Sequence, residues 1–224
     1  MAIEFKKISS PDPVVAYLAL EIAKHLSSRQ KVLWLVTGGS AMKIVVDTAN
    51  KIKSGDLKNL TVTLSDERYG PVGHQGSNWF QLKQAGFKLP GAALIPILDG
   101  GSMDKVVKRF NKILAREIKQ ADYKIGFIGI GPDSHIAGIK PHSPAIKAKA
   151  MATGYDWEDY RRITMTFPAI ELMDLVVTYL VGRAKQEAIE ALTKDASLAE
   201  VPSQILKRTK KAIIFNDKIG EAVG

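Results

Sequence analysis

Short apolar runs that end at glycine or polar residues alternate along the chain with amphipathic stretches. Residues 31–37 form a nearly continuous apolar run, as expected for a parallel strand covered on both faces. Four apolar side chains precede it at helical spacing: Val14, Leu18, Ile22 and Leu26. The alternation continues to the end of the chain. It predicts an α/β fold with a modified doubly wound (Rossmann-like), mostly parallel sheet and helices on both faces.

The same patterns place the remaining elements. Right-handed crossovers between parallel strands would bring the loops after the strands to one edge of the sheet, where α/β proteins bind ligands. No internal repeat, low-complexity linker or change in composition appears, so we expect one domain over residues 1–224. Further strands are predicted at 60–64, 93–98, 125–131, 162–167, 175–181 and 212–215, and helices after residue 40 to about 52, at 104–119 and at 184–192.

Composition narrows the chemistry. The 224 residues include 32 Lys and Arg against 23 Asp and Glu, a net charge of +9, and no cysteine. A disulfide, a thiolate zinc site and a cysteine nucleophile are therefore excluded. The excess of basic residues has three possible explanations: a nucleic-acid partner, an anionic metabolite as ligand, or simple solvation. No apolar run approaches the ~18–20 residues of a membrane-spanning helix, and no secretion signal is visible, so we expect a cytoplasmic protein without membrane contact.

The turn Gly38-Gly39-Ser40 stands where a strand gives way to a helix. Two glycines allow backbone N–H groups to approach an anion, and the helix start adds unpaired donors and positive potential. Ser40 offers a hydroxyl that can also cap the helix. The pattern fits a phosphate site, and it equally fits a plain tight turn with a helix cap.

The run Asp66-Glu67-Arg68 directly follows the strand at 60–64, so its side chains would project at the ligand-bearing edge. Three charges at that point need water or partners. They form either part of a binding site or a solvated strand end with an internal ion pair.

His135 follows the glycine-laced segment 125–131 in a turn. A histidine ring can accept a proton at neutral pH, which suits a general base. A carboxylate such as Asp66 or Asp133 could hold its tautomer. The plain alternative is an incidental loop histidine.

Basic residues supply further candidates. Arg162 at the start of a strand and Lys185 early in a helix could hold a phosphate. The stripe on the 104–119 helix and residues 207–211 are the best candidates for nucleic-acid contact. They lack interleaved aromatic residues and an accompanying motif, so solvated faces are the favoured interpretation and nucleic acid is an unlikely partner.

Taken in order, these motifs resemble the superfamily of 6-phosphogluconolactonases and glucosamine-6-phosphate deaminases. The resemblance covers nearly the whole chain and implies a sugar 6-phosphate or phosphorylated sugar lactone bound at the carboxyl ends of the strands, with no metal or organic cofactor. It implies that Asn78 contributes to substrate binding. The motifs are Gly38-Gly39-Ser40, Ser65-Asp66-Glu67-Arg68 with Ser77-Asn78, residues 129–137, Arg162-Ile163-Thr164, Gly182-Arg183-Ala184-Lys185, Pro202-Ser203 and Asn216-Asp217.

The resemblance also implies roles for single residues. The phosphate would be held by Gly38, Gly39, Ser40, Arg162 and Lys185. The reacting end of the sugar would face Asp66, Arg68 and His135. His135 would act as general base on a water that attacks the C1 carbonyl, Arg68 or backbone donors would stabilise the oxyanion, and Asp66 would orient the base or the substrate hydroxyls.

Two positions favour the lactonase branch. The deaminase pattern has a tyrosine where this chain has Arg68, and a glutamate where it has Lys140. We therefore expect a hydrolase, most similar to 6-phosphogluconolactonase, in the pentose phosphate pathway. The alternatives are an enzyme like glucosamine-6-phosphate deaminase, and a catalytically silent protein that binds sugar phosphate or nucleic acid.

The chain departs from the lactonase pattern at Ala41-Met42, where the pattern often has Thr-Pro, and at three residues near His135. Ser134 stands where the pattern has glycine, which would cost about 1 kcal/mol if that position needs a positive φ. Gly138 replaces a serine and removes a hydroxyl. Lys140 places a cation near the site. These changes bear on substrate preference and activity.

Overall fold

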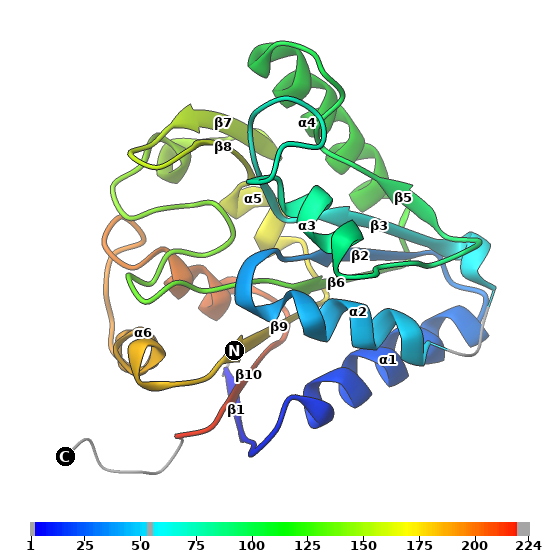
Figure 1. The fold of residues 1–224 in the computed structure, drawn as a ribbon. Helices are drawn as coiled ribbons and strands as arrows, with labels where there is room; N and C mark the ends of the chain where they lie inside the picture. The colour runs from blue at the N-terminus through cyan, green and yellow to red at the C-terminus, as the bar shows by residue number, and fades with distance from the viewer. Residues whose placement is uncertain (1–2, 53–55, 219–224) are drawn as a thin grey trace.

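Parallel strands form the central sheet of the protein, whose computed structural model describes residues 3–52 and 56–218 (Figure 1). Each neighbouring pair in this sheet runs parallel, so every connection between paired strands is a crossover. The mostly parallel α/β sheet predicted from the sequence is confirmed. In spatial order the strands are β1 (Glu4–Lys7), β10 (Ala212–Asn216), β9 (Leu175–Leu180), β6 (Tyr123–Phe127), β2 (Val32–Val36), β3 (Leu60–Leu64) and β5 (Ala93–Ile95).

Helices cover both faces of this sheet. The chain moves in one direction from β1 through β2 to β3 and reverses after β5, so right-handed crossovers place α1 and α2 on one face and α4 and α5 on the other (Figure 1). The predicted apolar face of α1 is buried, with Val14 and Leu18 at 0% exposure. The helices are α1 (Asp12–Ser27), α2 (Met42–Lys51), α3 (Asn78–Gln84), α4 (Met103–Gln120), α5 (Phe167–Glu171) and α6 (Gln186–Thr193).

A second, antiparallel sheet was not anticipated. It contains β4 (Asp66–Arg68), β8 (Arg161–Met165) and β7 (Ala152–Asp156), with β8 in the middle. Ser65 joins the two sheets, because its N–H donates to Val36 O at 2.8 Å while its carbonyl accepts from Met165 N at 2.9 Å. The strand expected at 162–167 therefore belongs to this sheet and not to the parallel one.

Three predicted strands end two or more residues early. The strand at 93–98 stops at Ile95 because Pro96 has no N–H for the ladder. The strand at 162–167 stops at Met165, and Phe167 begins α5. The strand at 125–131 stops at Phe127 because the glycine-rich chain beyond it folds back on itself through an antiparallel bridge between Ile130 and Ile136.

The topology gathers four loops at one edge. Strands β9, β6, β2 and β3 are consecutive in the sheet, and the chain leaves β2 toward β3 on one side while β6 lies on its other side. Such a reversal of strand order opens a crevice at the carboxyl ends of the strands. The loops that follow the four strands are 182–185, 128–135, 37–40 and the segment that starts at Ser65.

The basic stripe on α4 lies in solvent. Its members are Lys105, Lys108, Lys112, Arg116 and Lys119, all exposed, whereas Phe110 and Leu114 on the opposite side are fully buried. Within residues 3–52 and 56–218, the helices are too short or too polar to cross a bilayer.

Candidate active site

A cavity of about 280 Å³ opens at the carboxyl ends of the central strands. Side chains from both sheets line it, because β4 and β8 lie beside the loops that follow β2 and β6. Every site residue predicted from the sequence lines this one cavity: Gly38, Gly39, Ser40, Asp66, Arg68, Asn78, His135, Arg162 and Lys185.

The turn after β2 packs directly against α3. A Cβ atom on Gly38 would lie 2.2 Å from Asn78 Oδ1, so only glycine permits this approach. Asn78 Nδ2 in turn donates to the carbonyl of Asp66 at 3.0 Å, which links the end of β2 to the start of β4. The Oδ1 atom of Asn78 is buried and makes no hydrogen bond within the described part of the chain. Gly39 and Ser40 are exposed at the mouth of the cavity.

Glu67 is fully buried beneath the cavity. Its carboxylate accepts hydrogen bonds from the backbone N–H groups of Arg68 (2.7 Å), Asn78 (2.6 Å) and Trp79 (3.0 Å), and from Ser77 Oγ (2.9 Å). Two of these donors are free N–H groups in the first turn of α3. Burial raises the pKa of Glu67, although these hydrogen bonds act to lower it. The interpretation of this run as a solvated strand end is therefore wrong.

The residues on either side of Glu67 reach the cavity. Asp66 is 7% exposed and accepts from Ser65 Oγ at 3.1 Å. Arg68 donates from Nη1 to the carbonyl of Gly76 at 3.1 Å, and its guanidinium lies 5.3 Å from the ring centre of Tyr160. These contacts fix a carboxylate and a cation side by side at the cavity wall.

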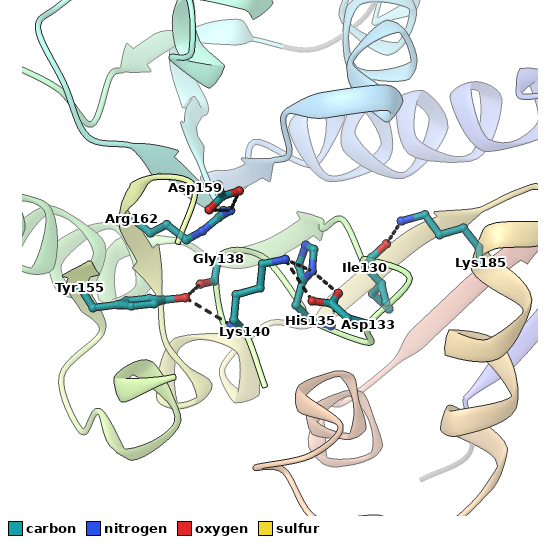
Figure 2. Close-up of polar contacts among 9 residues, drawn as sticks. All are labelled: Ile130, Asp133, His135, Gly138, Lys140, Tyr155, Asp159, Arg162 and Lys185. Atoms are coloured by element: carbon teal, nitrogen blue, oxygen red, sulfur yellow. Dashed lines mark hydrogen bonds and ion pairs between the residues drawn. The ribbon is translucent and has the colours of Figure 1, made fainter. Parts of the chain in front are cut away.

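His135 is paired with Asp133. The distance from Nδ1 to Asp133 Oδ1 is 2.5 Å, so of the two carboxylates considered for this role Asp133 makes the contact (Figure 2). Burial alone would raise the pKa of Asp133, but hydrogen bonds and positive charge from His135 and Lys140 hold it well below its usual range. An ionised Asp133 accepts a hydrogen bond from the Nδ1–H group, which leaves Nε2 as the basic nitrogen.

Ser134 confirms the expected backbone strain. Its φ is +63°, in the left-handed region that favours glycine. The strained turn folds the loop so that Gly131 N donates to the carbonyl of His135 at 3.0 Å. Ser134 therefore adopts the conformation that the glycine of the lactonase pattern would adopt without strain.

Lys140, the cation that the sequence placed near the site, enters the cavity. Its Nζ lies 3.0 Å from Asp133 Oδ2 and 3.1 Å from His135 Nδ1, and its side chain is 17% exposed (Figure 2). Tyr155 anchors this segment, since its hydroxyl donates to the Gly138 carbonyl at 2.5 Å and accepts from Lys140 N at 3.4 Å.

Gly138 is required by packing. A Cβ atom there would lie 2.8 Å from Thr164 Cβ and 3.1 Å from Asp66 Cβ. Glycine at this position therefore allows the loop to approach β8 and β4 closely. It also lacks the hydroxyl of the serine in the lactonase pattern.

The two predicted phosphate-binding cations already have partners. Both oxygens of Asp159 accept from Arg162 Nη2, at 2.8 and 2.7 Å, and Arg162 is 7% exposed. Lys185 donates to the carbonyl of Ile130. Burial lowers the pKa of Lys185, an effect that Asp133 opposes.

Sequence reasoning did not find the roles of Glu67 and Asp159, and it placed Lys140 near the site without its contacts to Asp133 and His135. Glu67 stands inside a recognised motif, but its burial depends on α3. Asp159 stands in a polar loop without any local signal. Among the described residues, no three His, Asp or Glu side chains cluster in a way that could ligate a metal ion.

Fold and site together define an α/β protein with a cation-lined pocket, containing a histidine–aspartate pair, at the carboxyl ends of parallel strands. Residues 10–215 match the family model described as "Glucosamine-6-phosphate isomerases/6-phosphogluconolactonase". The chain belongs to this family.

Relatives carry both names of the family. A glucosamine-6-phosphate deaminase of Lactobacillus johnsonii is 28% identical over 90% of this chain and 89% of its own. A 6-phosphogluconolactonase of Thermotoga maritima is 24% identical over 92% of this chain and 94% of its own. The crystal structure of a 6-phosphogluconolactonase from Shewanella baltica superposes with a TM-score of 0.83 at 21% identity, covering 96% of this chain and 97% of the other, and confirms the fold.

Proposed function

We propose that the chain is an enzyme that hydrolyses 6-phosphogluconolactone to 6-phosphogluconate, the lactonase step of the pentose phosphate pathway. The observation that carries this proposal is the convergence of all nine predicted site residues on one cavity, where one of them, His135, is paired with an ionised carboxylate. The family membership and several curated relatives named 6-phosphogluconolactonase support it.

His135 is the general base in this proposal. Asp133 holds the proton of Nδ1, so Nε2 takes a proton from a water molecule as the water oxygen bonds to C1 of the lactone. The carbonyl oxygen becomes an oxyanion, which Arg68 stabilises. When the bond from C1 to the ring oxygen breaks, Nε2 returns its proton to that oxygen. The product is one open-chain molecule, 6-phosphogluconic acid, whose new carboxyl group ionises in water.

The phosphate of the substrate binds at the turn Gly38-Gly39-Ser40 with Arg162 and Lys185. Backbone N–H groups and two cations provide the donors that a phosphate dianion requires. Because Arg162 is paired with Asp159 and Lys185 with a backbone carbonyl, the phosphate exchanges these partners for its own oxygens. Asn78 and Asp66 contact the sugar hydroxyls.

We also propose that the chain acts as a single domain, in the cytoplasm. The pairing of β1 with β10 supports the first statement, since the first and last strands of the described residues belong to one sheet.

Lactone hydrolysis above the spontaneous background tests the function. The wild-type protein should accelerate it, and His135→Ala should lose about 10²–10⁴-fold, the range of general-base catalysis. His142→Ala is the matched control, because this histidine is exposed in a loop outside the cavity lining. Full activity of folded His135→Ala would remove the base from the mechanism.

A second assay addresses the deaminase activity, which the relative from Lactobacillus johnsonii carries in its name. Ammonia release from glucosamine 6-phosphate should be absent, because the ammonium of Lys140 beside His135 repels a cationic amino sugar. Ammonia release without lactone hydrolysis would overturn the proposed reaction.

A further inference from the structure

The charges in contact with His135 have opposite signs. Asp133 alone would favour the imidazolium form, because an ionised carboxylate 2.5 Å from Nδ1 stabilises a positive ring. An imidazolium has no free lone pair and cannot take a proton from water. If Asp133 were its single charged neighbour, His135 would therefore be inactive as a base over part of the acidic pH range.

Lys140 supplies the opposing charge. Its ammonium lies 3.0 Å from Asp133 Oδ2 and 3.1 Å from His135 Nδ1, so it touches both members of the pair. The ammonium donates to the carboxylate and offsets its charge. Because the ammonium also lies 3.1 Å from His135 Nδ1, it makes a positive charge on the imidazole ring unfavourable.

The fold holds Lys140 in this place. The Tyr155 hydroxyl, on β7, donates to the Gly138 carbonyl and accepts from Lys140 N, so the backbone on which the lysine stands is tied to the second sheet (Figure 2). At 17% exposure, the Lys140 side chain is directed inward and differs from the fully solvated lysines of α4.

Other charged groups line the same cavity from neighbouring elements. Asp66 and Arg68 belong to β4, Arg162 belongs to β8 and pairs with Asp159, and Lys185 donates to a backbone carbonyl. The polar contacts of the histidine side chain among the described residues are to Asp133 and Lys140 alone. A change in its protonation on substituting Lys140 therefore reports on the lysine.

We propose that Lys140 is a positioning residue that keeps the ring of His135 uncharged before reaction. The proposal rests on the proposed lactonase function. Lys140 acts through Asp133 and His135 and forms no bond to the substrate.

The pH dependence of turnover tests this role. In Lys140→Met, the acidic limb of the kcat/KM profile should move to higher pH by roughly one unit, as expected for the loss of a neighbouring charge. Activity at about pH 5.5 should then fall several-fold, and activity at about pH 8.5 should stay within about twofold of wild type. Lys140→Arg should restore the profile. Lys43→Met is the matched control, since Lys43 forms an exposed ion pair with Asp47 at 2.7 Å on α2.

A direct titration separates this proposal from the proposed function. The Cε1 proton signal of His135, identified by its absence in His135→Gln, should titrate at higher pH in Lys140→Met than in wild type. Asp133→Asn should move the titration the other way. Coincident titrations of wild type and Lys140→Met would overturn the role of Lys140 even if lactone is hydrolysed. A protein that shows the shift but hydrolyses no lactone would refute the proposed function alone.

Discussion

Replacing Glu67 by glutamine tests how far the framework of the pocket depends on one buried carboxylate. Glutamine keeps the shape of the side chain and one of its two oxygens. Each oxygen of Glu67 accepts two hydrogen bonds: Oε1 from the N–H groups of Arg68 and Asn78, and Oε2 from Ser77 Oγ and the N–H of Trp79. The new amide NH2 must face one of these pairs of donors.

The expected cost follows from the donors that lose their acceptor. A buried N–H left unpaired costs about 1–3 kcal/mol, and hydrogen bonds to a charged group contribute about 1.5–3 kcal/mol each. Removing the buried charge offsets part of this loss, in keeping with the raised pKa of Glu67. We expect Glu67→Gln to lower the free energy of unfolding by about 2–3 kcal/mol. For a chain of this length that corresponds to a fall in Tm of roughly 4–12 °C.

Urea unfolding at pH 7, followed by circular dichroism, measures this difference. Glu158→Gln is the matched control, because Glu158 is exposed and its substitution should change the stability by less than about 0.5 kcal/mol. An unfolding free energy of Glu67→Gln within about 0.5 kcal/mol of wild type would refute the reasoning that this carboxylate holds β4 to α3.

Three further predictions follow from single contacts. Burial acts to raise the pKa of Asp174, but hydrogen bonds from Lys124 and Lys210 lower it. The ionised carboxylate therefore stabilises the fold above the unfolded-state pKa of ~3.9, and this stabilisation is lost as the pH falls below that value. Asp174→Asn should destabilise the protein at pH 7 and match wild type near pH 2 in thermal melts. Ser134→Gly should raise the unfolding free energy by about 0.5–1 kcal/mol by relieving the positive φ, and a decrease would contradict this. Asp159→Asn should free Arg162 and make inorganic phosphate bind about two- to fivefold more tightly in calorimetry, the effect of one half-exposed ion pair. Asp156→Asn, on the same hairpin, should leave that affinity unchanged.

Local pattern identified most of the central sheet. The strand at Leu60–Leu64 was predicted with its observed ends, and the apolar face of α1 is buried as expected. A strand covered on both faces needs a continuous apolar run, and a helix that covers it needs an apolar stripe, so both signals are carried by neighbouring residues. The short strands β4 and β7 carry no such signal, because they exist only through their pairing with β8.

The candidate site, like the fold, has features that the sequence predicted and features that it did not. Motif order along the chain pointed to every predicted member of the cavity, from Gly38 to Lys185, because the loops after the central strands meet β4, the start of β8 and the start of α3 at one edge of the central sheet. The contacts between those members were not accessible from the sequence. Whether Asp66 or Asp133 pairs with His135 depends on side-chain distances across the cavity.

What the sequence determined by itself was the α/β class, the edge that carries the site and the residue types gathered there, since these depend on periodicity and strand order. Tertiary structure alone decided that Glu67 is buried, that Asp159 forms an ion pair with Arg162 and that Lys140 contacts the histidine–aspartate pair. The physical reason is that burial and charge pairing are set by distances between side chains in the packed structure, even where the paired residues are only three or five positions apart in the chain. Such distances are fixed only when the two sheets and their loops pack together.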